Sequence, residues 1–181
     1  MTNLNTHIVL LRGINVGGHR KIKMADFKQL LLNSGFQNVQ TYIQSGNILC
    51  KSDQKKTVVK QQIERLIKET YGFEVTVLVL NSSELEHIIQ KNPFVQSQFP
   101  IEKLYCTLLE KKPDLEAQRL LLEYNSEDEE FVFDGALLYF CYHIGYGKSK
   151  VNNPFVEKKL KIQGTTRNWK TMNKLLELSS S

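Results

Sequence analysis

The stretch MADFKQLLLNSGFQNVQTYIQSGNILCK, residues 24–51, contains a helix followed by two strands, and it decides the fold. Between Met24 and Asn33 the apolar residues recur on one face at helical spacing, which predicts a helix packed on a core. Gly35 follows as a helix C-cap, and Phe36 is placed for the apolar contact that accompanies such a cap. The helix is therefore expected to end at this glycine.

Two strands complete this stretch. Residues 38–43 and 47–51 are predicted strands, and Gln44 to Gly46 joins them as a short turn of the hairpin kind. The two strands are therefore expected to be neighbours in one sheet.

The elements on both sides of this stretch extend the pattern. Residues 7–12 form a short apolar strand whose content predicts burial on both faces. After the hairpin, Asp53 is positioned to cap a helix that closes at Gly72, and residues 73–80 form a strand rich in β-branched side chains. The order strand, helix, strand, strand, helix, strand is the split βαβ arrangement called ferredoxin-like.

The second half of the chain repeats most of this order. Ser83 and Glu86 have the spacing of a capping box, which opens a helix that stops before Asn92-Pro93. The elements expected after it are a strand at 104–109, a helix at 113–124, strands at 130–134 and 136–143 joined through Asp134-Gly135, a helix capped by Asn153 that ends near Gly164, and a last helix carrying Trp169, Met172, Leu175 and Leu176.

We therefore predict an α+β protein of two ferredoxin-like (βαββαβ-type) subdomains, the second ending in extra helices. The N-terminal subdomain is expected to span residues 1–80, and the C-terminal subdomain, with the terminal helices, residues 81–181. The seam between them is expected around residues 81–100.

The composition is that of a globular chain. The 181 residues are 41% apolar and 24% charged, which excludes a disordered tail, a collagen-like repeat and a membrane protein. The three cysteines lie far apart in the sequence, with no apolar leader segment, which favours reduced and mostly buried thiols over a disulfide framework. We expect a cytoplasmic protein with no membrane partner.

The net charge of +5 is modest, but the charge is unevenly distributed. Residues 12–28 and residues 144–178 are both basic, whereas residues 127–130 are acidic. Each basic segment is either a solvated surface or a surface for an anionic partner such as nucleic acid.

The first candidate site is the loop RGINVGGHRK, residues 12–21, which leaves a buried strand and enters a helix. Its glycines let backbone N–H groups approach a ligand closely, and the nearby helix N-terminus favours an anion. His19-Arg20 stands where a P-loop requires Lys and Ser or Thr, and the spacing does not fit the dinucleotide fingerprint, so both nucleotide motifs are rejected. The alternative is a mobile connecting loop that Arg12 and Asn15 tie down.

The second candidate is the hairpin turn with Gln44, Ser45 and Asn47. Their side chains offer donors and acceptors that suit orienting a ligand, and that equally suit closing a turn on itself. A nucleophilic role for Ser45 is not expected, because no G-x-S-x-G motif surrounds it.

The third candidate is the stretch TTRNWKT, residues 165–171, which we expect at the head of the last helix. Threonine caps and an arginine in the first turn would make an anion site, because free N–H groups, the helix dipole and the guanidinium would point the same way. The alternative is an ordinary helix cap with Trp169 packed into the core.

Conventional catalytic and metal motifs are missing from the sequence. The four histidines are dispersed, and no H-E-x-x-H or paired C-x-x-C motif occurs, so neither a metal nor a cofactor is expected. The first-half strands at 8–11 and 47–51 lack the aromatic residues on which RNA-binding sheets stack bases. Phe131 and Phe133, at a spacing of two, are expected to face a core.

Three stretches together resemble a known family: LLRGINVGG at 10–18, YIQSGN at 42–47 and TRNW at 166–169. In this order they are similar to the mostly bacterial family catalogued as domain of unknown function 1697, and the likeness covers nearly the whole chain. It implies a cytosolic protein of two ferredoxin-like subdomains and no activity, because the family has none established. One departure is Lys23 before Met24, where family members often carry proline, which alters the stiffness of the loop.

The leading hypothesis is a pocket between the subdomains that binds a small anionic ligand, a nucleotide or another phosphorylated metabolite, with Arg12 and Arg167 as charge partners. The alternative is a nucleic-acid binding module that uses the basic loop and the C-terminal basic segment. In a third class, a structural or partner-binding protein, the three stretches are only turns and caps. The predicted ligand-binding residues are Arg12, Gly13, Asn15, Gly17, Gly18, Gln44, Ser45, Asn47, Thr166, Arg167 and Asn168.

Overall fold

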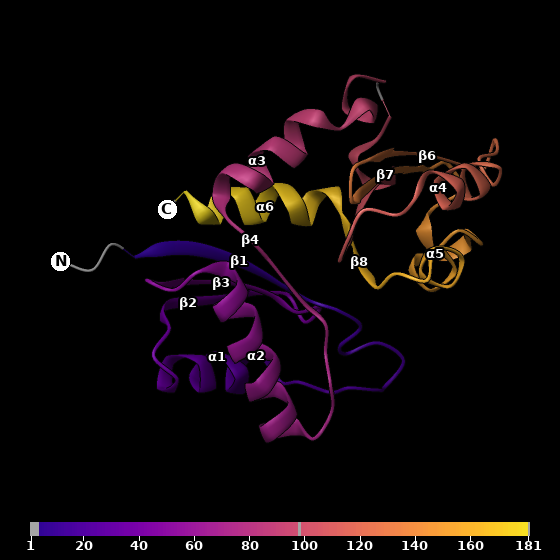
Figure 1. Cartoon of the computed structure of the whole chain (residues 1–181). Helices are drawn as coiled ribbons and strands as arrows, with labels where there is room; N and C mark the ends of the chain where they lie inside the picture. The colour runs from indigo at the N-terminus through magenta and orange to yellow at the C-terminus, as the bar shows by residue number, and fades with distance from the viewer. Residues whose placement is uncertain (1–3, 98, 181) are drawn as a thin grey trace. The chain divides into compact units, whose positions relative to one another are not determined.

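A computed structural model of the chain describes residues 4–97 and 99–180. Within these residues, helices are interspersed among strands that form two four-stranded antiparallel sheets. The fold is therefore α+β with two sheets, as predicted (Figure 1). The chain divides into two compact units. Unit 1 consists of the residues up to Ile88 together with those from Lys174 onward, and unit 2 is Ile89–Asn173.

Unit 1 has the element order strand, helix, strand, strand, helix, strand. Its elements are β1 (Asn5–Leu11), α1 (Met24–Asn33), β2 (Gln37–Tyr42), β3 (Asn47–Ser52), α2 (Lys56–Tyr71) and β4 (Val77–Leu80). The strands pair with antiparallel neighbours in the order β2-β3-β1-β4. Strands β1 and β3 are therefore central, and the two strands joined by each helix have one strand between them, which is the split βαβ order.

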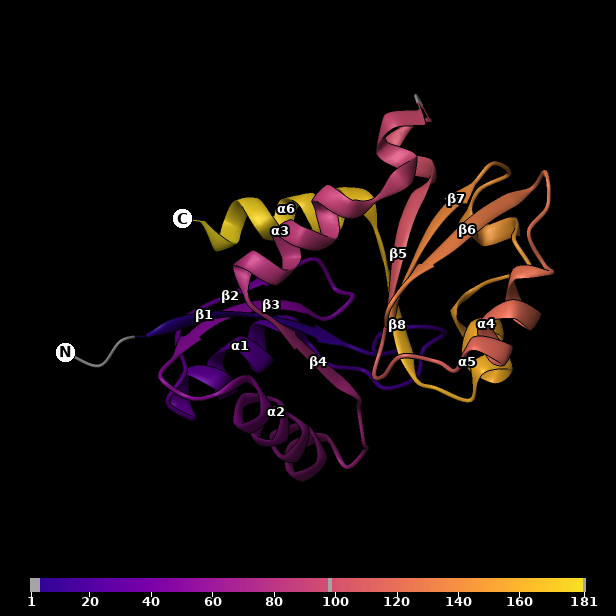
Figure 2. The same ribbon diagram turned by 45° about the horizontal axis from the view of Figure 1, so that its top comes forward.

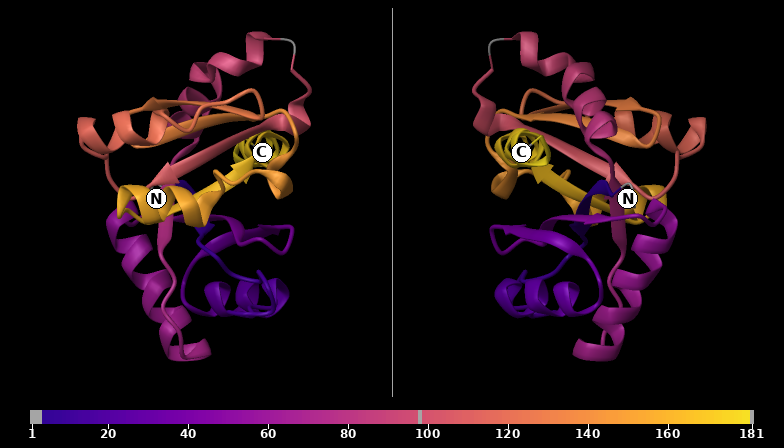
Figure 3. Two further views of the ribbon diagram at one scale, coloured as in Figure 1. Left: turned by 90° about the vertical axis from the view of Figure 1, so that its right-hand side faces the viewer. Right: turned by 90° about the vertical axis from the view of Figure 1, so that its left-hand side faces the viewer.

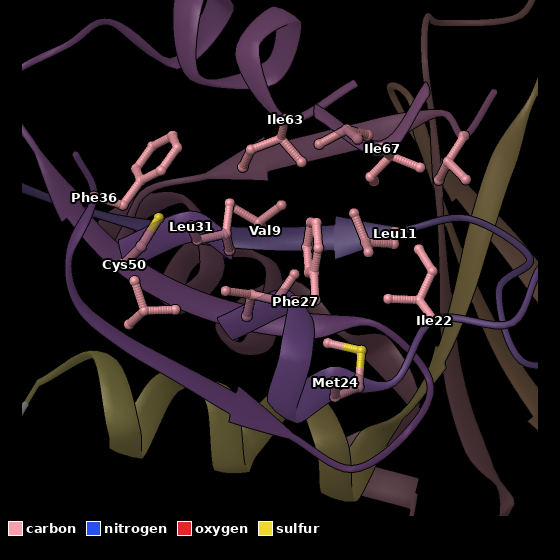
Figure 4. Packing of buried hydrophobic residues seen from close by; sticks show 14 of the residues in the cluster. Val9, Leu11, Ile22, Met24, Phe27, Leu31, Phe36, Cys50, Ile63 and Ile67 are labelled. Atoms are coloured by element: carbon pink, nitrogen blue, oxygen red, sulfur yellow. The ribbon is translucent and has the colours of Figure 1, made fainter. Parts of the chain in front are cut away.

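The main core of unit 1 lies between one face of this sheet and helices α1 and α2 (Figures 1 and 3). Burying one such aliphatic or aromatic side chain contributes about 1.5–3 kcal/mol relative to leaving it in water, so apolar burial holds both helices on the sheet. Figure 4 shows side chains of this core, which include Val9, Leu11, Phe27, Leu31, Cys50, Ile63 and Ile67.

The opposite face of the sheet is apolar as well. Ile8, Leu10 and Leu49 are buried there, so β1 is buried on both faces, as its sequence predicts. The residues of α6 (Trp169–Ser179) that belong to unit 1 lie against this face, since Leu178 and Ser179 line a cavity together with residues of β2 and β3 (Figure 2).

Unit 2 repeats the same order of elements. They are β5 (Leu104–Leu109), α4 (Leu115–Leu122), β6 (Glu129–Asp134), β7 (Leu137–Tyr142), α5 (Asn153–Leu160) and β8 (Gly164–Asn168). The sheet order β6-β7-β5-β8 is again antiparallel throughout. The unit boundaries fall inside α3 (Ser82–Lys91) and inside α6, so each of these helices contains residues of both units.

The core of unit 2 lies between one face of its sheet and helices α4 and α5 (Figure 2). Phe131 is 1% exposed, and its ring centroid lies 5.0 Å from that of Phe140. Phe133 packs against the same cluster. Both phenylalanines at a spacing of two therefore face the core, as predicted.

Strand β8 is not among the predicted strands. Helix α1 and strand β5 have the predicted bounds, but residues 164–168 pair with β5, with Thr107 opposite Thr166. The strand is short and polar, and a distant strand specifies its pairing, so apolar periodicity within the segment carries no signal for it. Helix α5 accordingly ends at Leu160 rather than near Gly164, where β8 begins.

The starts of three helices also differ from the prediction. The capping box of α3 is Asn81 with Glu84, not Ser83 with Glu86: the Glu84 N–H donates to Asn81 Oδ1 at 2.8 Å, and the Asn81 N–H donates to Glu84 Oε2 at 2.9 Å. The side chain of Asn152, not Asn153, caps α5, and α2 follows Lys55 without a side-chain cap from Asp53. Where several capping residue types stand close together, tertiary packing selects among them.

The cysteines confirm the expectation of buried thiols. Cys50, Cys106 and Cys141 are free and buried. Burial raises the pKa of Cys50 to about 12 and that of Cys141 to about 11, so these groups remain protonated near neutral pH. In the described part of the chain, no helix has the length and apolarity to cross a membrane.

His7 of β1 is a buried titratable group. It is 2% exposed, its Nε2 lies 3.3 Å from Ser52 Oγ, and its Nδ1 has no hydrogen-bond partner among the described residues. Burial lowers the pKa of His7 from its ordinary value of 6.5, and the charge of Lys56 lowers it further, against backbone groups of Ser52 and Gln54 that raise it. The fold therefore holds the neutral imidazole.

Acidification is expected to destabilise the protein through His7. Below about pH 6.5 the unfolded chain binds more protons than the folded one, so the free energy of unfolding falls by up to about 1.4 kcal/mol per pH unit until the folded pKa is passed. Urea unfolding at about pH 7 and at about pH 5 measures this loss of unfolding free energy. The loss should shrink in His7→Gln and persist in His87→Gln, whose side chain is exposed. Equal losses in all three proteins would contradict the assignment to His7.

Candidate functional site

The glycine loop, residues 12–23, connects β1 to α1 in unit 1 and folds into a small hairpin. The Asn15 N–H donates to the Arg20 carbonyl at 3.2 Å, and the His19 N–H donates to the Val16 carbonyl at 3.1 Å. Gly17 and Gly18 form the tip with φ of 58° and 78°, and two successive positive φ values are the mark of a type I′ turn. Both glycines are therefore required by the turn itself.

The side chain of Asn15 fastens the base of this loop. Its Oδ1 accepts from the Ile22 N–H at 2.9 Å, and its Nδ2 donates to the carbonyls of Ile22 at 2.9 Å and Gln44 at 2.7 Å. The last bond joins the glycine loop to the turn between β2 and β3. Asn15 thus ties the loop down, as one of the two sequence interpretations describes.

The hairpin turn, residues 43–46, presses directly against the end of β1. The Leu11 N–H donates to the Gly46 carbonyl at 2.8 Å. A Cβ on Gly46 would stand 2.7 Å from Leu11 Cβ and 2.9 Å from Ile14 Cδ1, so the space admits only glycine. The buried Asn47 closes the turn, since its Nδ2 donates to the Tyr42 carbonyl at 3.1 Å and to Ser45 Oγ at 2.9 Å.

We name residues 12–23 and 43–46 the loop cluster. These contacts bring the first two predicted stretches together within unit 1, although they are separated by a helix and a strand. The predicted site residues in or next to the loop cluster are Arg12, Gly13, Asn15, Gly17, Gly18, Gln44, Ser45 and Asn47.

Positive charge and accessible main chain coincide on the loop cluster. The Nη1 atom of Arg20 lies 3.7 Å from the position of a Cβ on Gly13, so this guanidinium folds over an exposed glycine. Lys21 is exposed and Arg12 half-buried, and the Arg12 N–H donates to the Thr76 carbonyl at 3.0 Å. The loop cluster therefore has cationic side chains next to the accessible main chain of a glycine.

The third predicted stretch lies in unit 2, and its local structure corrects the prediction. Thr165, Thr166 and Arg167 belong to strand β8, not to the first turn of a helix. Asn168, rather than a threonine, caps α6, because its Oδ1 accepts from the Thr171 N–H at 2.8 Å. Thr165 and Thr166 pair with β5 as strand residues, so the threonine-capped helix entrance does not form.

Arg167 is a buried guanidinium, 7% exposed. Its Nη1 donates to Thr165 Oγ1 at 2.6 Å and to the Thr166 carbonyl at 3.0 Å. Burial lowers the pKa of Arg167 to about 10, and the phenol of Tyr146 raises it in part. The charge of Arg167 is therefore held in surroundings that disfavour it.

The remaining side chains of this stretch have structural contacts. Thr166 Oγ1 lies 2.7 Å from Thr107 Oγ1 and donates to Asn153 Oδ1 at 2.9 Å. Trp169 is buried, with its ring centroid 6.3 Å from that of Tyr139. Among the described residues, no three His, Cys, Asp or Glu side chains are grouped so that they could hold a metal ion.

Two residues of the loop cluster are missing from the predicted site. Arg20 stands in the quoted loop, but its position over Gly13 depends on the register of the small hairpin. Ile43 has a φ of 50°, a left-handed conformation that is rare for a β-branched residue. Local sequence signals do not indicate either feature.

Comparisons with known proteins are consistent with this fold. A family model described as a protein of unknown function (DUF1697) matches residues 4–139. The solved structure of conserved bacterial protein SP0830 from Streptococcus pneumoniae matches with a TM-score of 0.73 and 23% sequence identity, covering 98% of this chain and 99% of that chain. At that identity the likeness shows the fold alone. No curated protein matches the chain.

Gly46→Ala is expected to destabilise the protein by about 2–4 kcal/mol, because the new Cβ must displace Leu11 and Ile14 and must also adopt a φ of 77°. Gly72→Ala is the matched control: its φ is 78°, but nothing lies within 4 Å of an added Cβ. We expect it to lose only about 1 kcal/mol. Urea unfolding of both variants measures the difference, and equal losses would contradict the close approach at Gly46.

Proposed function

We propose that this chain, which belongs to the DUF1697 family of proteins of unknown function, binds a small anionic ligand at the loop cluster of unit 1. The observation that carries this proposal is the guanidinium of Arg20, 3.7 Å from the Cβ position of the exposed Gly13. A planar set of N–H donors beside an accessible main chain suits the oxygens of a phosphate or carboxylate. The ligand class is therefore a phosphorylated metabolite or a comparable small anion.

The charge of the surrounding loop supports the same ligand class. Arg12 and Lys21 add positive charge, while Asp26 of α1 is paired with Lys23 at 3.6 Å. A single exposed ion pair contributes only about 0–1 kcal/mol, so binding requires several of these groups at once. Arg12 and Arg20 are the proposed pair of charge contacts within unit 1.

The amide side chains have different roles in this proposal. Asn15 and Asn47 are positioning residues, because their hydrogen bonds hold the two loops in place. The exposed Gln44 and the half-buried Ser45 are proposed to contact the ligand directly. Gly13, Gly17 and Gly18 allow it to approach the main chain.

Arg167 is proposed as an anion contact within unit 2. Burial lowers its pKa to about 10, and a bound anion would stabilise its charged form. Arg167→Lys is the variant that tests this role, because lysine keeps a cation but loses the planar fork of donors. Weaker pyrophosphate binding by this variant, at unchanged stability, would support the role, and unaltered binding would reject it.

Calorimetric titration with inorganic pyrophosphate tests the loop cluster. Arg20→Gln is expected to weaken binding about tenfold or more. Lys28→Gln removes the same charge from an exposed position of α1 outside the loop, and we expect a change below about twofold. Equal affinities of the two variants would reject the loop cluster as the site.

A short single-stranded RNA is the second arm of this experiment, at about 50 mM and about 200 mM salt. The nucleic-acid alternative predicts that RNA binds, that binding falls steeply with salt, and that the loss is shared by many lysines. RNA binding of this kind without pyrophosphate binding would replace the small-anion proposal.

A further inference from the structure

Two aliphatic side chains are exposed on the loop cluster. Val16, next to the tip of the glycine loop, is 65% exposed, and Ile43 of the hairpin turn is 50% exposed. The two loops touch through the hydrogen bond from Asn15 Nδ2 to the Gln44 carbonyl at 2.7 Å. Val16 follows Asn15 in the chain, and Ile43 precedes Gln44. Single exposed aliphatics are common on proteins, but these two stand on adjoining loops that also carry Arg20.

The backbone of Ile43 adopts a conformation that its own side chain disfavours. Its φ of 50° lies in the left-handed region, where a β-branched side chain is strained and where glycine or asparagine is usual. The neighbouring contacts impose this conformation, because Gly46 and Asn47 fix the turn on the end of β1. Strain of this kind concentrates at ligand-binding sites.

The two loops also carry polar side chains. The exposed amide of Gln44 follows Ile43 in the chain, and the guanidinium of Arg20 lies over Gly13. The loop cluster thus carries cationic donors, an amide with both donor and acceptor, and exposed aliphatic side chains. No Phe, Tyr or Trp occurs in residues 12–23, so a flat ring bound here would rest on aliphatic rather than aromatic side chains.

We infer that the anionic ligand is a nucleotide whose phosphate contacts Arg20 and Gly13 and whose base covers Val16 and Ile43. This inference rests on the proposed function and narrows its ligand class. A nucleotide combines the two chemistries that the loop cluster presents, a phosphate anion and a flat ring with apolar faces and polar edges. The Gln44 amide matches the donors and acceptors of a base edge.

Calorimetric titrations with ADP, inorganic pyrophosphate and adenosine test the inference. ADP is expected to bind about tenfold or more tighter than pyrophosphate, and adenosine alone more weakly than ADP. Ile43→Gly is the decisive variant, because glycine adopts the same φ without strain and removes only the side chain. The variant should fold with equal or higher stability and lose the advantage of ADP over pyrophosphate.

Val16→Ser is expected to reduce the same advantage, whereas Val58→Ser, at an exposed valine of α2 that is 44% accessible, should leave it unchanged. Equal affinities for ADP and pyrophosphate in the parent, both weakened by Arg20→Gln, would overturn the nucleotide inference and retain the proposed function. An ADP advantage that survives in Ile43→Gly and Val16→Ser would also overturn the inference. Binding of ADP and pyrophosphate that is insensitive to Arg20→Gln would overturn both.

Discussion

The absence of a side chain at Gly46 is the constraint on which the loop cluster depends. Because no Cβ separates them, the hairpin turn and the end of β1 approach closely enough for the Leu11 N–H to reach the Gly46 carbonyl at 2.8 Å. That contact brings the turn within reach of Asn15, whose side chain then bonds both to its own loop and to Gln44. One missing carbon atom thus determines where the basic residues of the glycine loop are held.

Apolar periodicity and turn residues sufficed to predict the first βαββαβ unit and all but the last strand of the second, because each helix and most strands bury one regular face. Helix α1 and strand β5 even have the predicted bounds. Strand β8 was not predicted, because its residues are polar and its strand conformation depends on pairing with β5. The helix caps at Asn81 and Asn152 illustrate a related limit, because the residues at 81–83 and at 152–153 are all good capping types and their local preferences do not distinguish them.

The candidate site was predictable in part for the same reason. Glycines and polar residues at 12–18 and 44–47 mark turns in the sequence, and the ferredoxin-like order places the C-terminal end of β1 and the hairpin turn at the same end of the sheet. The position of Arg20 over Gly13 and the left-handed backbone of Ile43 depend on contacts between the two loops, which neither segment encodes alone. The Arg167 stretch shows the converse, because its residues favour a helix entrance and a strand alike until a partner strand is present.

Unit 1 is discontinuous in sequence, and this has a consequence for biosynthesis. The residues from Lys174 onward complete this unit, so its sheet is translated well before the segment of α6 that lies against it. At about 5–20 residues per second, synthesis of the intervening residues 89–173 occupies roughly 4–17 s. During that interval the sheet face that carries Thr6 and Leu49 lacks the α6 segment whose Leu178 and Ser179 lie beside it. The first part of the chain to leave the ribosome therefore completes its fold only after the C-terminal helix has been synthesised.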